Sequence, residues 1–176
     1  KEIIKKSTFT YVRQKEMLGL GHAILTGEIL IGDESFAVVL ADDLCDCDDN
    51  GVISQMIEIY NQYKCSIVAI EEVPINQTSK YGIIAGNLLD NSKNTYQVID
   101  MVEKPDEKNA PSNMAIIGRY ILTPDIFNIL KNIKPDKNGE IQITDALKIQ
   151  AKQDKVVAYK FKGKRFDCGS VRGYLE

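Results

Sequence analysis

The chain has 176 residues, of which 44% are hydrophobic, 27% charged and 7% aromatic, and this length predicts a single domain over residues 1–176. Its 22 Lys and Arg against 25 Asp and Glu give a net charge of −3, which argues against a nucleic-acid partner because such proteins neutralise phosphates with basic side chains. No apolar stretch approaches the roughly 20 residues of a membrane span, so no membrane partner is expected.

The first half of the chain alternates apolar β-branched runs with segments of helical period, a pattern that indicates an α/β fold. Residues 9–12 are predicted to form a strand, and residues 22–29 a helix that follows two closely spaced glycines. The apolar run 36–40 predicts a central strand covered on both faces. Apolar residues three or four apart predict an amphipathic helix over 52–63, and residues 66–70 predict the next buried strand.

Beyond Pro74 the pattern changes. Two runs, 81–85 and 96–102, flank a short polar segment and predict an antiparallel pair of strands. The remaining predicted elements are a strand at 114–122, a helix capped by Thr123 and ending near 133, a helix at 144–152, and short strands at 156–161 and 165–167. Together these elements predict one mixed sheet with a parallel core and an antiparallel extension.

Three aspartates mark the ends of predicted strands. Asp42 and Asp43 follow the apolar run 36–40, and Asp167 ends a short strand before Gly169. Ligands of open α/β sheets lie beyond the carboxyl ends of strands, where adjacent carboxylates can hold Mg²⁺ on a phosphate. Alternatively, Asp42 and Asp43 cap the next turn and Asp167 bonds to the turn that follows it.

The acidic run at residues 46–53 imitates an EF-hand calcium loop, since Asp46, Asp48 and Asn50 alternate before Gly51. The closing bidentate Glu is missing, because Ile57 stands at that position. The favoured interpretation is a solvated loop that leads into the helix beginning at Val52.

Other polar groups lie at predicted junctions. Gln14 precedes Gly19, and an amide next to a close-approaching glycine backbone can read a base edge, although a lone G-x-G is more often a tight turn. Glu103 and Lys104 end a strand on opposite faces, where they either meet a sugar and its phosphate or form an ordinary surface ion pair. His22, the one histidine, lacks an evident nucleophile partner, which argues against hydrolase chemistry.

The four cysteines are too few for a secreted disulfide scaffold of this length. Cys45 and Cys47 stand one residue apart, without the C-x-x-C spacing of zinc or redox sites. We expect reduced thiols in a cytoplasmic protein.

Taken in order, these motifs resemble the bacterial UTP–glucose-1-phosphate uridylyltransferases, a branch of the sugar-nucleotide pyrophosphorylases. The resemblance covers essentially the whole chain. It is carried by Tyr-Val-Arg-Gln (11–14), Gly-Leu-Gly-His-Ala (19–23), Val-Leu-Ala-Asp-Asp (39–43), Lys-Tyr-Gly (80–82), Val-Glu-Lys-Pro (102–105), Pro-Ser-Asn-Met-Ala-Ile-Ile-Gly-Arg-Tyr (111–120), Gly-Glu-Ile-Gln-Ile-Thr-Asp-Ala (139–146) and Lys-Gly-Lys-Arg-Phe-Asp-Cys-Gly (162–169).

The resemblance implies a Rossmann-like nucleotide-diphospho-sugar transferase fold, with a mixed, mostly parallel sheet, helices on both faces and a small antiparallel extension. It implies that Gln14 and Gly19 read uracil and that Asp42 and Asp167 hold Mg²⁺. The further implied roles are nucleotide or sugar contact for Asp43, hexose contact for Glu103, Tyr81, Gly82 and Ile116, and sugar-phosphate binding for Lys104.

The implied reaction joins UTP and glucose 1-phosphate to give UDP-glucose and pyrophosphate, in a homo-oligomeric parent enzyme. The family's Gly-rich triphosphate loop, of the form G-x-G-T-R, has no counterpart here. We therefore expect an internal piece of such an enzyme, trimmed at both ends and poorly active alone. Two alternatives stay open: transfer of a thymidylyl or other nucleotidyl group, and a non-catalytic module that binds sugar nucleotides.

Overall fold

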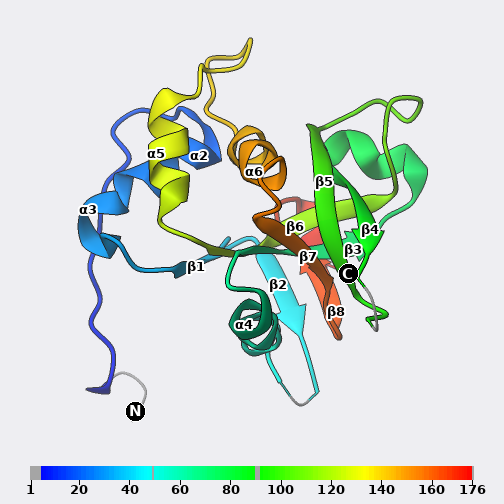
Figure 1. Cartoon of the computed structure of the whole chain (residues 1–176), viewed down its shortest axis with the longest axis horizontal. Coiled ribbons are helices and arrows are strands. Elements are labelled where there is room, and N and C mark those ends of the chain that lie inside the picture. The colour runs from blue at the N-terminus through cyan, green and yellow to red at the C-terminus, as the bar shows by residue number, and fades with distance from the viewer. Residues whose placement is uncertain (1–4, 49, 90–91, 176) are drawn as a thin grey trace.

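The computed structural model describes residues 5–48, 50–89 and 92–175; residues 49, 90 and 91, which belong to the acidic run and to the polar segment between predicted strands, lie outside this part. Its main sheet has six strands, and α helices pack on both sides of it (Figure 1). The strands are β1 (Phe36–Val39), β3 (Ser66–Glu72), β4 (Gly82–Leu88), β5 (Thr95–Glu103), β6 (Met114–Leu122) and β7 (Val156–Lys160).

The sheet is mixed but mostly antiparallel, which corrects the predicted parallel core. The strand order is β1-β6-β3-β7-β5-β4, and the pairing of Ile83 with Ala115 joins β4 back to β6 to close a ring. Among the described residues only β3 and β7 pair in parallel. The prediction is wrong because β1 and β3 are not neighbours: the long strand β6 runs between them and is antiparallel to both.

The predicted helices on both faces are confirmed. One core cluster joins β6, β5 and β7 to three helices, and another joins the opposite face to a single amphipathic helix, α4 (Val52–Tyr63). Figure 1 shows α4 on one side of the sheet and the three helices of the first cluster on the other. The helices are α2 (Gly19–Thr26), α5 (Asp125–Asn132) and α6 (Ile143–Ala151) on one face and α4 (Val52–Tyr63) on the other.

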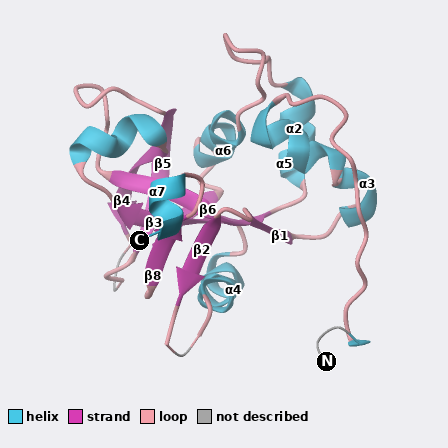
Figure 2. Ribbon diagram, turned by 180° about the vertical axis from the view of Figure 1, so that it is seen from behind, coloured by secondary structure: helices cyan, strands magenta, loops and turns pink. Residues whose placement is uncertain are grey.

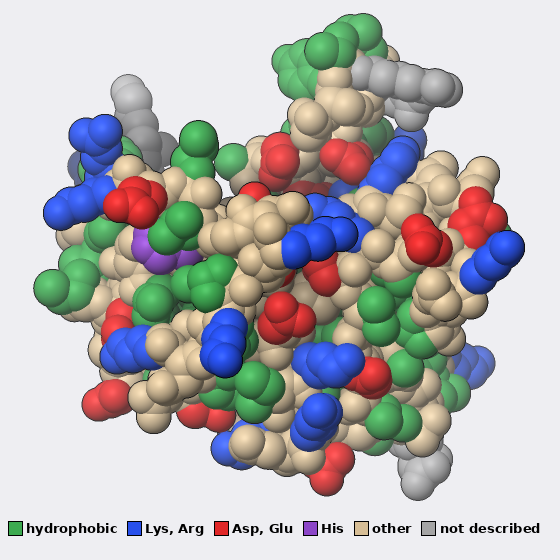
Figure 3. Space-filling model, turned by 90° about the horizontal axis from the view of Figure 1, so that it is seen from above, with side chains coloured by type: hydrophobic (Ala, Val, Ile, Leu, Met, Phe, Trp, Pro, Cys, Tyr) green, Lys and Arg blue, Asp and Glu red, His purple; other side chains and the backbone are tan. Residues whose placement is uncertain are grey.

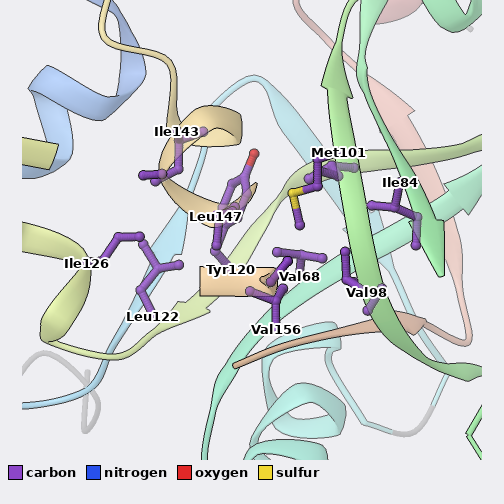
Figure 4. Close-up of a cluster of buried hydrophobic side chains, with 14 of the residues drawn as sticks. Val68, Ile84, Val98, Met101, Tyr120, Leu122, Ile126, Ile143, Leu147 and Val156 are labelled. Carbon is purple, nitrogen blue, oxygen red and sulfur yellow. The ribbon is translucent and has the colours of Figure 1, made fainter. Parts of the chain in front are cut away.

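The first of these clusters contains Tyr120, a β6 residue that is only 5% exposed. Figure 4 shows Tyr120 with Leu147 of α6 and Met101 of β5 around it. Burial raises the pKa of the Tyr120 hydroxyl, and the charges of Glu103 and Asp43 add to that rise. The core thus reaches the polar residues at the ends of the strands.

A separate two-stranded ribbon was not predicted. It pairs β2 (Asp43–Asp46) antiparallel with β8 (Lys164–Asp167), and α7 (Val171–Leu175) follows directly. Figure 2 shows the two strands side by side next to α7. The register places Asp43 directly opposite Asp167. The other short elements are α3 (Glu28–Ile31) and the 3-10 helix η1 (Ile75–Lys80).

Three local predictions are wrong. Residues 9–12 form no strand, and Phe9 and Tyr11 are 66% and 91% exposed, so burial does not stabilise an extended conformation there. The run 36–40 is an edge strand rather than a central one, because β6 is the only described strand that pairs with β1 and only half of the β1 residues are partly buried. Thr123 does not cap α5; its hydroxyl donates to the Asp125 carboxylate at 2.5 Å instead.

The helix predicted over 22–29 begins earlier, at Gly19, and is divided at Gly27 into α2 and α3. The other elements match their predictions more closely. Helix α4 and strand β6 have the predicted bounds, and β4 and β5 form the predicted antiparallel pair. The acidic run leads from β2 into α4, as the loop interpretation requires. No helix among the described residues is both long and apolar enough to cross a bilayer.

Candidate active site

A cavity of about 400 Å³ opens where the ends of β4, β5 and β8 meet the loop before α6. Figure 3, which views the molecule from above, shows acidic and basic side chains in close proximity on this face. Eight of the ten residues predicted to form the site line this one cleft. They are Asp42, Asp43, Tyr81, Gly82, Glu103, Lys104, Ile116 and Asp167.

Asp42 and Asp167 converge although they are 125 positions apart in the sequence. The amide of Cys168 donates to the Asp42 carbonyl at 2.7 Å, which ties the loop after β1 to the end of β8. A Cβ placed on Gly169 would lie 3.2 Å from Asp42 Oδ2 and 3.2 Å from Asp167 Oδ1. The two oxygens are therefore no further apart than twice that distance, and glycine at 169 leaves the space between them open.

The two oxygens of Asp167 face different partners. Oδ1 accepts a hydrogen bond from the Gly169 amide at 3.1 Å. Oδ2 accepts one from the Tyr81 hydroxyl at 3.1 Å and lies 3.3 Å from Arg165 Nη2. The carboxylate is thus held from one side, with Oδ1 near Asp42.

Sequence reasoning missed Arg165, although it stands two residues before Asp167 on a predicted strand, a spacing that puts both side chains on one face. Its side chain is 9% exposed and pairs with Asp43 at 2.7 Å and with Glu71 at 3.5 Å. Burial alone would lower the pKa of Arg165, but hydrogen bonds and charge from Asp43 and Tyr81 outweigh it and raise that pKa. Burial raises the pKa of Glu71, although Arg165 opposes this rise.

Asp43 lies in the cleft wall with both carboxylate oxygens already engaged. Oδ1 accepts from Arg165 Nε, and Oδ2 accepts from the Gly118 amide at 2.7 Å. Arg119 also donates to the Asp43 carbonyl. These bonds assign Asp43 to holding the wall together, while its predicted contact with nucleotide or sugar stays a prediction.

Strand alternation predicts that Glu103 and Lys104 point to opposite faces, but in the structure both line the same cleft. Strand β5 ends at Glu103, and Lys104 has a positive φ of 45°, which turns its side chain back into the cleft. Lys104 Nζ lies 3.7 Å from Glu103 Oε1, and the lysine side chain is 56% exposed. An exposed cation and a fixed carboxylate therefore share one wall.

Thr144, also missed from the sequence, fixes that carboxylate: its hydroxyl donates to Glu103 Oε2 at 2.5 Å. The backbone at Gly82 approaches the same pair, because a Cβ there would lie 3.0 Å from Thr144 Oγ1 and 3.2 Å from Glu103 Oε2. Ile116 supplies an apolar contact beside them. The arrangement suits a ligand that combines hydroxyl groups with an apolar face.

Gln14 and Gly19 do not line the cleft themselves, but Leu20, the residue after Gly19, does. Gln14 Nε2 donates to the Gly19 carbonyl at 3.2 Å and lies 3.0 Å from His22 Nδ1. Because Nε2 of Gln14 faces both of these partners, the side-chain oxygen Oε1 of Gln14 points away from them. Figure 3 shows the histidine among hydrophobic side chains on the face seen from above.

The residues at the Asp42–Asp167 end fit a magnesium ion. Mg²⁺ usually binds through one or two carboxylates plus substrate phosphates and retains water, and converging carboxylate oxygens meet that need. In the described ranges no third Asp, Glu, His or Cys joins the pair to build an all-protein cage. Oxygens from a phosphate ligand would complete the coordination.

Known proteins that resemble this chain are nucleotidyl transferases. A family model described as nucleotidyl transferase matches residues 2–176. A UTP–glucose-1-phosphate uridylyltransferase of Pseudomonas aeruginosa is 60% identical over 177 residues, covering 100% of the chain and 63% of the relative. One from Staphylococcus saprophyticus is 47% identical over 166 residues, covering 94% and 56%. The chain therefore spans about 63% of the length of the first of these relatives.

Solved structures agree. A UDP-glucose pyrophosphorylase in complex with UDP-glucose matches with a TM-score of 0.95 at 62% identity, over 99% of this chain and 66% of that one. The UTP-bound enzyme from Acinetobacter baumannii matches with a TM-score of 0.82 at 39% identity, over 93% and 56%.

Proposed function

Because the chain belongs to the nucleotidyl transferase family, we propose that its cleft serves the transfer of a uridylyl group from UTP to glucose 1-phosphate. Similarity to uridylyltransferases and to a pyrophosphorylase bound to UDP-glucose supports the choice of substrates. The single observation that carries the proposal is the convergence of Asp42 and Asp167 in the same cleft as Glu103 and Lys104.

In the proposed reaction, a phosphate oxygen of glucose 1-phosphate attacks the α-phosphorus of UTP. One P–O bond forms, the bond to the β-phosphate oxygen breaks, and pyrophosphate leaves with the electron pair. The attacking oxygen is already ionised, so the protein supplies no nucleophile and no general base. Its contribution is the alignment of two anionic substrates and the neutralisation of their charge.

Each wall of the cleft has a role in this alignment. Glu103, fixed by Thr144, accepts hydrogen bonds from sugar hydroxyls, while Gly82 and Ile116 leave room for the hexose ring. Lys104 meets the sugar phosphate as a compact point charge. Gln14 offers Oε1 to the N–H of uracil, beside the Gly19 backbone.

Asp42 and Asp167 are the residues that would hold Mg²⁺, which when bound supplies positive charge to the phosphates of both substrates. The protein's own task is to hold the two carboxylates turned toward one another.

The test is Asp42→Asn and Asp167→Asn, each made in this chain and at the aligned position of the Pseudomonas aeruginosa relative. In the relative, each variant should lower pyrophosphate release from UTP and glucose 1-phosphate by about 100-fold or more, the loss typical of removing one charge-stabilising group. In this chain, calorimetry should detect UDP-glucose binding that Mg²⁺ strengthens in the wild type but not in the variants. Unchanged turnover in both variants would refute the assignment.

The same assays separate the alternatives. Faster turnover with dTTP than with UTP would indicate a thymidylyltransferase, and tight UDP-glucose binding that ignores Mg²⁺ would indicate a non-catalytic module. We expect this 176-residue chain to turn over poorly by itself, because no G-x-G-T-R segment is present to bind the triphosphate. Assembly as a homo-oligomer stays a prediction, which the molar mass from light scattering tests.

A further inference from the structure

The ribbon of β2 and β8 brings two like charges face to face. Asp43 and Asp167 are directly opposed in the register, and such cross-strand pairs place their Cβ atoms about 5 Å apart. Like charges in that position repel. Arg165 stands two residues before Asp167 on the same face, diagonal to Asp43, and it is the cation between them.

Arg165 is a buried residue of the cleft wall that is held by several contacts. Its Nε donates to Asp43 Oδ1 at 2.7 Å, and Asp43 is in turn fixed by the Gly118 amide of β6 at 2.7 Å. The arginine also lies over the Tyr81 ring, with its guanidinium carbon 5.1 Å from the ring centre. Since the side chain is only 9% exposed, these contacts leave it little freedom.

A second nitrogen of the same guanidinium, Nη2, contacts Asp167. Nη2 lies 3.3 Å from Asp167 Oδ2, the oxygen that also accepts from the Tyr81 hydroxyl. That contact leaves Oδ1 on the side of Asp42. Asp167 therefore uses Oδ2 to contact Arg165 and Tyr81, while Oδ1 lies on the side of the cleft where Asp42 is.

We propose that Arg165 is a positioning residue that orients Asp167 for divalent-cation binding, by joining it to Asp43 and the main sheet. The inference depends on the proposed function, because it assumes that Asp42 and Asp167 share a cation. A lysine at 165 keeps the charge but cannot replace the anchor. Its single ammonium group cannot span Asp43 and Asp167 with two fixed donors, as the planar guanidinium does.

Two simple electrostatic views make the opposite prediction. A positive charge next to a cation site disfavours the cation, so removing Arg165 should tighten binding if charge alone decides. Freeing Asp167 Oδ2 from Arg165 should also make the carboxylate a better ligand. Orientation acts the other way, and the sign of the change distinguishes the two accounts.

The test measures Mn²⁺ binding to this chain in excess UDP-glucose, using the electron paramagnetic resonance signal of free Mn²⁺. We expect Arg165→Lys and Arg165→Gln each to weaken binding about tenfold. The matched control is Lys164→Gln, which removes one positive charge from the neighbouring position of β8; it should leave Mn²⁺ affinity equal or slightly tighter. In both Arg165 variants the metal-free binding of UDP-glucose should weaken much less than Mn²⁺ binding does, and Lys164→Gln should leave it within about twofold of the wild type.

Equal or tighter Mn²⁺ binding by Arg165→Lys would overturn the proposal, as would a matching loss of metal-free UDP-glucose binding. If Arg165→Gln fails to fold, because Asp43 is left buried without its partner, the lysine variant alone decides. If the wild-type chain binds UDP-glucose but no Mn²⁺, the metal assignment of the proposed function fails, and the role of Arg165 falls with it.

Discussion

Gly21→Ala tests how the segment around Gln14 is held against the rest of the molecule. Gly21 lies in α2, where a Cβ would meet Ile141 O at 2.6 Å and both Ile141 Cγ2 and Leu130 Cδ2 at 2.9 Å. The Gly21 amide also donates to that same Ile141 carbonyl at 2.8 Å. A methyl group therefore has to push α2 away from the loop that carries Glu140 and Gln142 into the cleft.

Opposing effects set the size of the change. Overpacking a tight contact costs about 1–3 kcal/mol, and loss of the backbone hydrogen bond costs about 1 kcal/mol more. Replacing a helical glycine by alanine returns about 1 kcal/mol. The net destabilisation is about 1–3 kcal/mol, which for a chain of this length lowers the melting temperature by about 3–9 °C.

Thermal unfolding followed by circular dichroism checks this value. Gly51→Ala is the control, because no atom of the described residues lies within 4 Å of a Cβ at that position and its φ of −55° suits any residue; it should melt within about 2 °C of the wild type. A Gly21→Ala variant as stable as the wild type would refute the reasoning. Helix propensity would then outweigh a contact that the loop can relax.

Two further substitutions address charge and hydrogen bonding. Hydrogen bonds from Thr123 and Gln150 outweigh burial and lower the pKa of Asp125, so the ionised carboxylate stabilises the fold above its unfolded pKa of about 3.9. Asp125→Asn should therefore lower the melting temperature at pH 7, and the difference from the wild type should shrink as the pH falls through the lowered folded pKa; a constant difference down to pH 2 would contradict this. Thr144→Val removes the hydroxyl that fixes Glu103 and should weaken UDP-glucose binding about tenfold, the value of one hydrogen bond to a charged group. Thr144→Ser keeps that hydroxyl, and calorimetry should find its affinity close to that of the wild type.

Local periodicity was enough to predict elements that obey it throughout. Helix α4 repeats apolar residues three or four apart and buries Val52 and Met56, and β4 and β5 are antiparallel neighbours in the sheet, so both appear where they were expected. Strand direction was not predictable, because a buried apolar run looks the same in parallel and antiparallel sheets. The place of β6 between β1 and β3 is a property of the whole chain.

The candidate site shows the same division. Asp42, Asp167 and Glu103 were found because charged residues at the ends of apolar strands stand out in a sequence. Thr144 gave no such signal, since a threonine at the start of a helix usually serves the helix itself. The turn at Lys104 was hidden for another reason: a positive φ in a residue other than glycine follows from surrounding packing, which no short window of sequence contains.

Strand β7 has consequences for how the polypeptide is synthesised. Residues 156–160 insert between β3 and β5, and four of the five are buried. Both neighbouring strands leave the ribosome much earlier and wait with one edge unpaired until this late segment emerges. A nascent chain that stalls before residue 156 therefore exposes two strand edges with unpaired backbone N–H and C=O groups. Chaperones protect such surfaces from aggregation.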